Sequence, residues 1–318
     1  MKIVMLEPLG VSTEVLDRLS QRLRSEKHEF IAYDTVTKDP EELKKRASGA
    51  DVLIIANNPL PGEVIRSVES LKFISVAFTG IDHVDKAACI EKGVSLSNAA
   101  GYSTEAVAEL VIGMIISKLR YIVECNTVVR QGKTKDGLVG CELAGKTVGI
   151  VGTGAIGLRT AELLKAFGCR LLGYNRSVRK EGEELGIRYV DLEELLKESD
   201  IITLHTPLTE DTKFLINKDN LSLLKPDALL VNCARGQVID IEATAQALKE
   251  KKLAGAAIDV FEIEPPLPTD HVLFDAPNAL LTPHVAFATK ESMVRRAQIT
   301  FDNIYSWLEG NQINKMLV

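Results

Sequence analysis

The chain has 318 residues, a formal net charge of −6, 46% hydrophobic residues and 26% charged residues. A single domain commonly has about 100 to 200 residues, so this length predicts two domains, and the average composition excludes disorder, collagen and a disulfide scaffold. A protein that binds nucleic acid would need a surplus of Lys and Arg, so no nucleic-acid partner is expected.

The five cysteines lie far apart and include no CxxC pair, which argues against a disulfide framework and against a thiolate metal site. We therefore expect no bound metal. The N-terminal stretch MKIVMLEPLG is too short in apolar residues for a signal peptide, and no segment approaches the ~18 apolar residues of a membrane span. These features predict a cytoplasmic protein with no membrane partner.

Between Lys2 and Leu96, short runs rich in Ile and Val alternate with charged segments of helical period. This alternation is typical of βαβ units on a parallel sheet. The predicted strands are Ile3–Leu6, Phe30–Tyr33, Val52–Ile55, Phe73–Ala77 and Val94–Leu96.

A helix is predicted next, capped by Ser103 or Thr104 and ending near Arg120. Its apolar residues follow helical spacing, at Val107, Leu110, Val111, Met114 and Ile115. The segment Val123–Ala144 has no clean period and contains several glycines, so we interpret it as an arm or long connection.

A second alternating pattern begins at Thr147 and predicts a second, larger parallel sheet. Its strands are expected at Thr147–Val151, Arg170–Tyr174, Ile187–Val190, Ile201–Leu204, Leu229–Val231, Ala256–Asp259 and Leu280–Thr282. After Thr289 a long helix ending at Gly310 is predicted, which we expect to pack on the first domain. Its apolar face consists of Met293, Ala297, Phe301, Ile304 and Leu308.

The segment GTGAIG follows the strand KTVGIV and opens a helix predicted over Ala155–Phe167. In a dinucleotide site, Gly152 allows the tight turn, Gly154 lets the pyrophosphate approach the backbone, and Gly157 lets the helix meet the sheet. Ala155 and Ile156 in the first helical turn are further expected contacts. A tight strand-to-helix turn without a ligand is the alternative, but the strand–turn–helix context favours dinucleotide binding.

The end of the next strand distinguishes NAD from NADP, since an NAD site usually places an acid there to bind the ribose hydroxyls. Asn175 occupies this place, and no acid occurs within residues 163–180. The turn instead carries Arg176, Ser177, Arg179 and Lys180. Guanidinium groups bind a 2′-phosphate well, so NADP(H) is favoured, with NAD(H) possible. A solvated basic turn with weak selectivity is the alternative.

Three polar residues follow predicted strands of this second sheet, namely Arg235, Glu264 and His284. Ligands of open α/β sheets bind at the carboxyl ends of the strands, where these side chains should converge. A carboxylate beside an imidazole orients it for general acid catalysis, and an arginine can bind a carboxylate and polarise a carbonyl. Singly, each residue also has an ordinary structural explanation as a surface cation, a loop acid or a turn residue.

The segments LLVNCARGQVID, AAIDVFEIEPP and LTPHVAFAT resemble the three active-site segments of the D-isomer-specific 2-hydroxyacid dehydrogenases, in the same order after the glycine motif. VAFTGIDHVD and NAAGYSTEAVAEL extend the resemblance toward the N-terminus. It implies two doubly wound α/β domains, in agreement with the segment pattern. A Rossmann domain over 99–288 would be inserted into a discontinuous, flavodoxin-like substrate domain of residues 1–98 and 289–318.

The resemblance implies hydride transfer between the coenzyme and a small 2-oxo or 2-hydroxy acid. Arg235 would bind the substrate carboxylate and 2-oxo group, Glu264 would pair with the imidazole, and His284 would be the acid–base group. The backbone at Thr79 and Gly80 would hold the substrate carboxylate. The implied coenzyme contacts include Asp259 at the nicotinamide carboxamide, Thr206 and Pro207 on the adenosine side, and Cys233, Ala234 and His284.

Departures from the family pattern favour glycerate dehydrogenase and the hydroxypyruvate or glyoxylate reductases. Asn57 and Asn58 stand where 3-phosphoglycerate dehydrogenases place an arginine for the substrate phosphate, and the chain ends soon after the last predicted helix. The segment GYSTEAVAEL and Phe287 point the same way. A phosphoglycerate or other D-2-hydroxyacid dehydrogenase is the alternative.

A dinucleotide-sensing corepressor of the C-terminal-binding-protein type is a non-enzymatic alternative, disfavoured because no low-complexity tail is present. An enzyme for phosphite or formate is disfavoured for lack of extra cations beside Thr79. The resemblance also implies a homodimer through the nucleotide domains, for which the arm Val123–Ala144 and the helix before it are the expected contact surface. An intramolecular clasp is the alternative for this arm.

Overall fold

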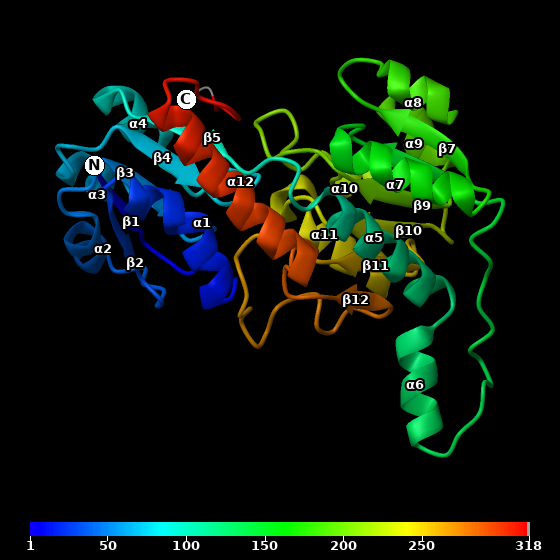
Figure 1. Ribbon diagram of the computed structural model, residues 1–318. Coiled ribbons are helices and arrows are strands. Elements are labelled where there is room, and N and C mark those ends of the chain that lie inside the picture. The colour runs from blue at the N-terminus through cyan, green and yellow to red at the C-terminus, as the bar shows by residue number, and fades with distance from the viewer. Residues whose placement is uncertain (317–318) are drawn as a thin grey trace. The chain divides into compact units, whose positions relative to one another are not determined.

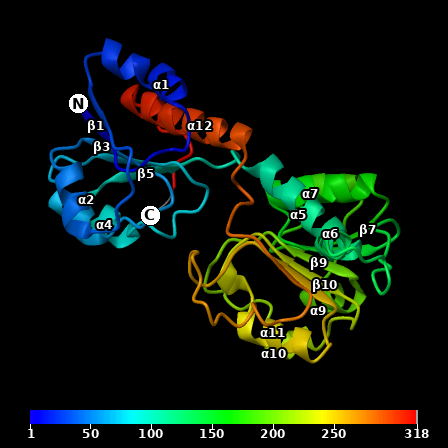
Figure 2. The ribbon, with the colours of Figure 1, turned by 90° about the horizontal axis from the view of Figure 1, so that it is seen from below.

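The computed structural model describes residues 1–316, and the chain forms two compact units. The first unit consists of Met1–Ser103 together with the C-terminal segment that begins at Ala288, and the second unit is Thr104–Phe287. Each unit is a parallel β-sheet with helices on both faces, as Figure 1 and Figure 2 show.

The first unit has a five-stranded sheet of order β2-β1-β3-β4-β5, which is the flavodoxin-like order. Its strands are β1 (Lys2–Met5), β2 (Glu29–Ala32), β3 (Val52–Ile55), β4 (Phe73–Val76) and β5 (Ser95–Asn98). Its helices are α1 (Thr13–Ser25), α2 (Pro40–Ala47), α3 (Gly62–Ser67), α4 (Lys86–Lys92) and α12 (Lys290–Leu308). Helices α1 and α12 lie on one face of the sheet, and α2 and α4 lie on the other (Figure 2).

Helix α12 completes the core of the first unit, as predicted from its apolar spacing. Thr289 caps it by accepting the backbone N–H of Ser292 at 3.1 Å. Phe301 and Ile304 are fully buried against the sheet, and the ring of Trp307 stacks on Phe73 with centroids 5.1 Å apart. Burial of such side chains stabilises the unit by about 1.5–3 kcal/mol each.

The second unit has a seven-stranded parallel sheet of order β12-β11-β10-β9-β6-β7-β8. Its strands are β6 (Thr147–Val151), β7 (Arg170–Tyr174), β8 (Arg188–Tyr189), β9 (Ile201–Leu204), β10 (Leu229–Asn232), β11 (Gly255–Ile258) and β12 (Ala279–Leu281). Its helices are α5 (Thr104–Leu119), α6 (Ile122–Arg130), α7 (Ala155–Ala166), α8 (Lys180–Leu185), α9 (Leu192–Glu198), α10 (Lys218–Leu221) and α11 (Ile241–Lys249), with a 3₁₀ turn at Gly236–Val238.

The strand order of the second unit reverses direction between β6 and β9, which are hydrogen-bonded neighbours. This is the Rossmann arrangement, in which the ligand crevice lies at the carboxyl ends of the two strands at the reversal. Helices α5 and α7 lie on one face of the sheet and α9, α10 and α11 on the other (Figure 2). The predicted fold class of two parallel-sheet α/β domains is confirmed.

One sequence prediction needs correction. Within Val123–Ala144, expected to be an arm or connection without a clean period, the structure has the helix α6 over Ile122–Arg130. None of its residues is buried, so it has no apolar face against the sheet from which a helical period could have been read. The remaining chain to β6 is largely irregular.

Candidate active site

The glycine-rich turn joins β6 to α7 in the second unit. Gly152 has φ of +95°, and a Cβ atom there would lie 2.8 Å from the carbonyl carbon of His205, so only glycine fits without strain. A Cβ atom on Gly157 would lie 2.0 Å from the carbonyl oxygen of Gly152, which explains the close packing of α7 on the turn. At Gly154, by contrast, a Cβ atom would meet nothing within 4 Å, so the backbone at the helix N-terminus is open to a ligand.

Two features of this turn fit a dinucleotide. The first-turn N–H groups of α7, which include those of Ala155 and Ile156, have no carbonyl partners within the helix and favour an anion such as a pyrophosphate. The hydroxyl Oγ1 of Thr206, after β9, is buried and has no hydrogen-bond partner among the described residues. A buried hydroxyl without a partner is costly, and a bound ligand would satisfy it. The residues therefore fit a dinucleotide coenzyme.

His205 lies beside the same turn, and its Nε2 is 3.0 Å from the hydroxyl of Thr203. Burial lowers the pKa of the His205 imidazole to about 4. At neutral pH the group next to the glycine turn is therefore uncharged. Pro207, which follows Thr206, is exposed, and its carbonyl accepts the hydroxyl of Thr212 at 2.6 Å.

The loop after β7 is tied to the glycine turn, because the N–H of Gly152 donates to the carbonyl of Tyr174 at 2.8 Å. Asn175 follows directly and donates its side-chain N–H to the carbonyl of Ser177 at 2.8 Å. Arg176 and the following residues are exposed. NAD sites usually have an acid at the position of Asn175, and the exposed cationic loop begins at the next residue, Arg176.

The side chain of Asn232, at the end of β10, shapes the turn that carries Arg235. Its amide oxygen accepts the N–H of Ala234 at 3.0 Å, and its amide nitrogen donates to the carbonyl of Arg235 at 2.9 Å. The Sγ of Cys233 is buried 3.6 Å from the sulfur of Met114, and burial raises the pKa of this thiol well above its usual value. The thiol of Cys233 is therefore uncharged at neutral pH, and Arg235 is half-buried just beyond it.

The structure brings Glu264 and His284 together. Nδ1 of His284 lies 2.9 Å from both carboxylate oxygens of Glu264. A carboxylate only accepts hydrogen bonds, so Nδ1 carries the proton that it donates to Glu264. The ring also packs edge-to-face on Phe287, with centroids 5.4 Å apart.

Asp259 holds the turn that presents His284. Its fully buried carboxylate accepts the hydroxyl of Thr282 at 2.5 Å and the N–H groups of Val285 and Ala286 at 2.9 Å each. The backbone N–H of His284 donates to the Asp259 carbonyl at 2.8 Å, and His284 adopts φ of +54°. Such backbone strain in a non-glycine residue persists where neighbouring contacts over-determine it, and it is common at active sites.

Thr79 and Gly80 belong to the first unit, in the loop after β4. The hydroxyl Oγ1 of Thr79 is buried without a hydrogen-bond partner, and across residues 1–316 the backbone N–H groups of Thr79 and Gly80 also find no acceptor. Successive unpaired N–H groups of this kind form a concave anion site. The loop therefore suits a carboxylate.

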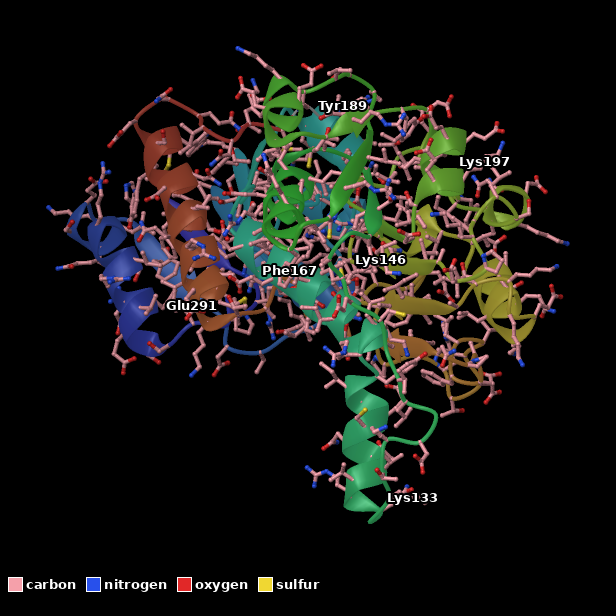
Figure 3. The ribbon with its side chains drawn as sticks, turned by 90° about the vertical axis from the view of Figure 1, so that its right-hand side faces the viewer. Lys133, Lys146, Phe167, Tyr189, Lys197 and Glu291 are labelled. Atoms are coloured by element: carbon pink, nitrogen blue, oxygen red, sulfur yellow. The ribbon has the colours of Figure 1, made fainter. Side chains whose placement is uncertain are left out.

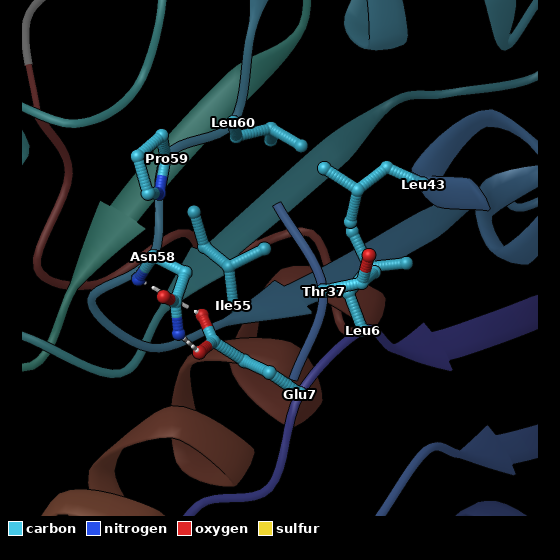
Figure 4. A pocket seen from close by; sticks show the side chains of 8 residues that line it. All are labelled: Leu6, Glu7, Thr37, Leu43, Ile55, Asn58, Pro59 and Leu60. Atoms are coloured by element: carbon cyan, nitrogen blue, oxygen red, sulfur yellow. Dashed lines mark hydrogen bonds between the residues drawn. The ribbon is translucent and has the colours of Figure 1, made fainter. Parts of the chain in front are cut away.

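A residue that the sequence analysis missed, Glu7, lies at the point where the order of the first sheet reverses, between β1 and β3. Its carboxylate accepts the backbone N–H of Ala56 at 2.7 Å. It also accepts the backbone N–H of Asn58 at 3.2 Å and binds the side-chain amide of Asn58 (Figure 4). The cavity beside this pair is about 10 Å³, room for one water molecule at most. A carboxylate placed directly after a strand was the available sequence signal.

Among the described residues, no helix is long and apolar enough to cross a membrane. Within the same part of the chain, no group of three or more His, Cys, Asp or Glu side chains is arranged to hold a metal ion.

Comparisons with known proteins identify the family to which the chain belongs. The family described as D-isomer specific 2-hydroxyacid dehydrogenase, NAD binding domain, matches residues 112–286. A glyoxylate reductase of Thermofilum pendens is 39% identical over 278 residues, which cover 85% of this chain and 82% of that protein. A hydroxypyruvate reductase of Blautia hydrogenotrophica is 33% identical over 322 residues and covers 99% of both chains.

A solved structure of an acyclic imino acid reductase in complex with NADPH and D-Arg matches all of both chains with a TM-score of 0.89 and 30% identity. The chain belongs to the D-isomer specific 2-hydroxyacid dehydrogenase family. It is an NAD(P)-dependent oxidoreductase that acts on 2-hydroxy acids and their 2-oxo counterparts.

Proposed function

We propose that this enzyme reduces small, unphosphorylated 2-oxo acids of the glyoxylate and hydroxypyruvate type to D-2-hydroxy acids, with NADPH preferred over NADH. The observation that carries the proposal is the bond from Nδ1 of His284 to the Glu264 carboxylate, 2.9 Å long, beside a strained turn anchored by buried Asp259. The names of the relatives, glyoxylate reductase and hydroxypyruvate reductase, support the choice of substrate.

The coenzyme would be held by the glycine turn, the first turn of α7, the buried hydroxyl of Thr206 and the backbone at Cys233 and Ala234. Its nicotinamide supplies the hydride that reduces the 2-oxo carbon. Asp259 would support the nicotinamide side of the site through the turn that its buried carboxylate holds, at the N–H groups of Val285 and Ala286.

His284 serves as the general acid in this proposal. Its Nδ1 proton is engaged by Glu264, so the second proton of the imidazolium, on Nε2, passes to the substrate oxygen as the carbonyl is reduced. The carboxylate of Glu264 stabilises the imidazolium before transfer and keeps the ring oriented afterwards. In the reverse reaction the neutral Nε2 accepts the hydroxyl proton.

Arg235 and the loop at Thr79 and Gly80 bind the acid in this proposal. The planar guanidinium of Arg235 stabilises the charge that accumulates on the 2-oxo oxygen and pairs with the substrate carboxylate. The unpaired N–H groups of Thr79 and Gly80 donate to that carboxylate.

The preference for unphosphorylated substrates rests on Glu7. The carboxylate of Glu7 holds Asn58 at the strand-order reversal of the first unit, where a ligand of a flavodoxin-like sheet commonly binds. A dianionic phosphate would meet a carboxylate and a cavity of about 10 Å³ there, rather than a cation. A substrate with no group, or only a hydroxyl, beyond the 2-oxo carbon avoids this repulsion.

The experiment that tests the reaction measures NADPH oxidation with glyoxylate, hydroxypyruvate, pyruvate and 3-phosphohydroxypyruvate. His284→Asn should reduce kcat by about 10²- to 10⁴-fold, as expected for loss of a positioned general acid, while coenzyme affinity stays unchanged. Turnover of the wild type on none of the four acids would overturn the proposal. Preference for the phosphorylated acid would overturn the assignment of the substrate class.

The preference for NADPH rests on the loop after β7. Asn175 replaces the usual acid, and exposed Arg176 and Arg179 follow it beside the turn of Gly152. Arg176→Ala should weaken NADPH binding by about 1.5–3 kcal/mol, the usual contribution of a hydrogen bond to a charged group, and leave NADH binding unchanged. Adding Asn175→Asp should invert the preference.

Arg170→Ala provides a matched control for this titration, since Arg170 is an exposed arginine at the opposite end of the same strand. It should not change the affinity for either coenzyme. Equal wild-type affinity for NADH and NADPH, unaffected by Arg176→Ala, would show that the loop is a solvated basic turn that does not select the coenzyme.

We also propose that the enzyme is a homodimer. Helix α6 extends away from the rest of the second unit and leads to Lys133 at the tip of the arm (Figure 3). Its Val129 is 69% exposed, and Val139 on the returning chain is 78% exposed. A nine-residue helix without buried residues is unstable alone, so a second copy is the expected partner. Val129→Glu should convert the dimer to a monomer in sedimentation experiments, and a monomeric wild type would contradict the proposal.

The two units would then serve as domains, with residues 1–98 and 289–318 binding the substrate and residues 99–288 binding the coenzyme. The anion-binding loop at Thr79 in one unit and the glycine turn at Gly152 in the other support this division.

A further inference from the structure

The loop after β4 is held by residues at the end of the neighbouring strand β5. The backbone N–H of Ala99 donates to the carbonyl of Phe78 at 2.9 Å. The side-chain amide of Asn98 donates to the carbonyl of Thr79 at 2.6 Å. Two successive carbonyls of the loop are therefore aimed toward the end of β5.

This orientation determines where the neighbouring N–H groups point. A trans peptide unit is planar, with its C=O and N–H directed to opposite sides. The N–H of Thr79 therefore points away from Ala99, and the N–H of Gly80 points away from Asn98. Both donors face the same side, and neither has an acceptor among the described residues.

Asn98 is hydrogen-bonded to two further asparagines, Asn303 and Asn314. Its carbonyl accepts the side-chain amide of Asn303, on α12, at 2.8 Å. The amide oxygen of Asn303, which is fully buried, accepts the side-chain N–H of Asn314 at 2.8 Å. The backbone N–H of Asn98 donates to the carbonyl of Asn314 at 3.2 Å. The segment after α12 is thus connected to the loop at Thr79 through hydrogen bonds alone.

The same segment also pairs with β5 independently of this chain of asparagines. Gln312 donates its side-chain amide to the carbonyl of Leu96 at 3.0 Å and to the hydroxyl of Ser97 at 3.1 Å. The N–H of Met316 donates to the carbonyl of Leu96 at 2.9 Å. Asn314 is thus linked to Thr79 through Asn303 and Asn98, whereas Gln312 contacts only β5.

We propose that Asn98 is a positioning residue that aims the Gly80 N–H at the substrate carboxylate, and that Asn303 and Asn314 connect the segment after α12 to substrate affinity. The inference rests on the proposed role of Thr79 and Gly80 as the carboxylate site. An asparagine that served only to satisfy buried polar groups would affect the free energy of unfolding. One that orients a carboxylate donor affects substrate binding as well.

The test compares steady-state kinetics of Asn98→Ala, Asn314→Ala and Gln312→Ala with glyoxylate and NADPH. Asn98→Ala should raise the KM for glyoxylate about 5- to 10-fold, the factor that corresponds to one lost hydrogen bond, with kcat and the KM for NADPH within about twofold. Asn314→Ala, at an exposed position, should raise the KM for glyoxylate about two- to threefold. Gln312→Ala, the matched control, should leave it unchanged.

A second measurement does not depend on catalysis. Hydrogen exchange of the Ala99 amide, which donates to the Phe78 carbonyl of the loop, should accelerate in Asn98→Ala, which removes the donor to the Thr79 carbonyl. It should accelerate less in Asn314→Ala, which removes only the donor to Asn303, and it should not change in Gln312→Ala. If the wild type reduces glyoxylate but Asn98→Ala leaves both KM and exchange unchanged, the positioning role is wrong and the proposed function stands. An equal KM effect of Gln312→Ala would likewise overturn it. If the wild type reduces no 2-oxo acid, the proposed function fails, and the exchange rates still decide whether Asn98 orients the loop.

Discussion

Gly236 and Phe261 lie so close that a Cβ atom on Gly236 would be 1.9 Å from the Phe261 carbonyl oxygen. The turn that carries Arg235 is thereby packed directly on the backbone that leads to Glu264. Both partners in this contact are backbone, so neither can yield by a side-chain rotation.

Gly236→Ala should therefore disturb both turns at once. We expect the free energy of unfolding to fall by about 1–3 kcal/mol, as for overpacking elsewhere, and kcat to fall as well. Thermal or chemical unfolding and steady-state assays measure the two effects. Gly113→Ala is the control, because a Cβ atom there meets nothing within 4 Å in the middle of α5. Gly113→Ala should leave the free energy of unfolding unchanged or raise it. If Gly236→Ala also leaves stability and kcat unchanged, the contact between Gly236 and Phe261 is unimportant.

Glu264→Gln should lower kcat for 2-oxo acid reduction. The carboxylate, 2.9 Å from Nδ1 of His284, orients the ring that donates the proton, and the amide keeps the shape of the side chain but not its charge. Steady-state assays measure the loss of kcat, while unfolding should be little changed. Glu262→Gln, which removes a carboxylate bound to His271 in the same loop, should leave kcat unchanged. An unchanged kcat for Glu264→Gln would exclude this residue from the role.

Arg235→Lys should reduce kcat/KM for 2-oxo acids about 10- to 100-fold, corresponding to one lost hydrogen bond between charged groups. Lysine keeps the positive charge but lacks the planar pair of donors, so both a higher KM and a lower kcat are expected. Full kcat/KM in the lysine variant would show that Arg235 acts only as a point charge.

The stability of the coenzyme-free protein should depend on His205 at mildly acidic pH. Burial lowers its pKa from 6.5 to about 4 in the folded chain. Above pH 6.5 the imidazole is neutral in both states and contributes no pH dependence. Between 6.5 and about 4 only the unfolded chain binds the proton, so the free energy of unfolding falls as the pH falls, by up to about 3 kcal/mol.

Denaturant titrations at pH 7 and pH 5 measure this slope. His205→Gln should flatten it. An identical pH dependence in the wild type and His205→Gln would contradict the assignment.

The parallel-sheet fold could be predicted because its signals are local. Strands such as Val52–Ile55 and Thr147–Val151 are continuous apolar runs, and the glycine turn follows its strand directly. The boundaries differ slightly, as at β5, which ends at Asn98 rather than Leu96. Helix α6 was missed because none of its residues is buried, and because β-branched residues such as Val129 lower its helical propensity.

The contacts that refine the candidate site are not local. Glu7 binds a residue 51 positions away, and Asn98 binds a residue 19 positions away. Carboxylates and amides near strand ends are common in any sequence, so the partners of Glu7 and Asn98 could not be predicted without the order of the strands in the sheet. The placement of the polar residues after β10, β11 and β12 was predictable, since parallel strands end at one edge.

The two units are completed at different times during synthesis. Residues Thr104–Phe287 leave the ribosome before α12, whereas the core of the first unit needs Phe301 and Ile304 from that helix. A nascent chain arrested before α12 should therefore hold a protease-resistant second unit and a protease-sensitive first unit, and equal resistance of both would contradict this order. During that interval the apolar sheet face that later receives α12 is exposed, and it is the surface on which a chaperone would be expected to bind.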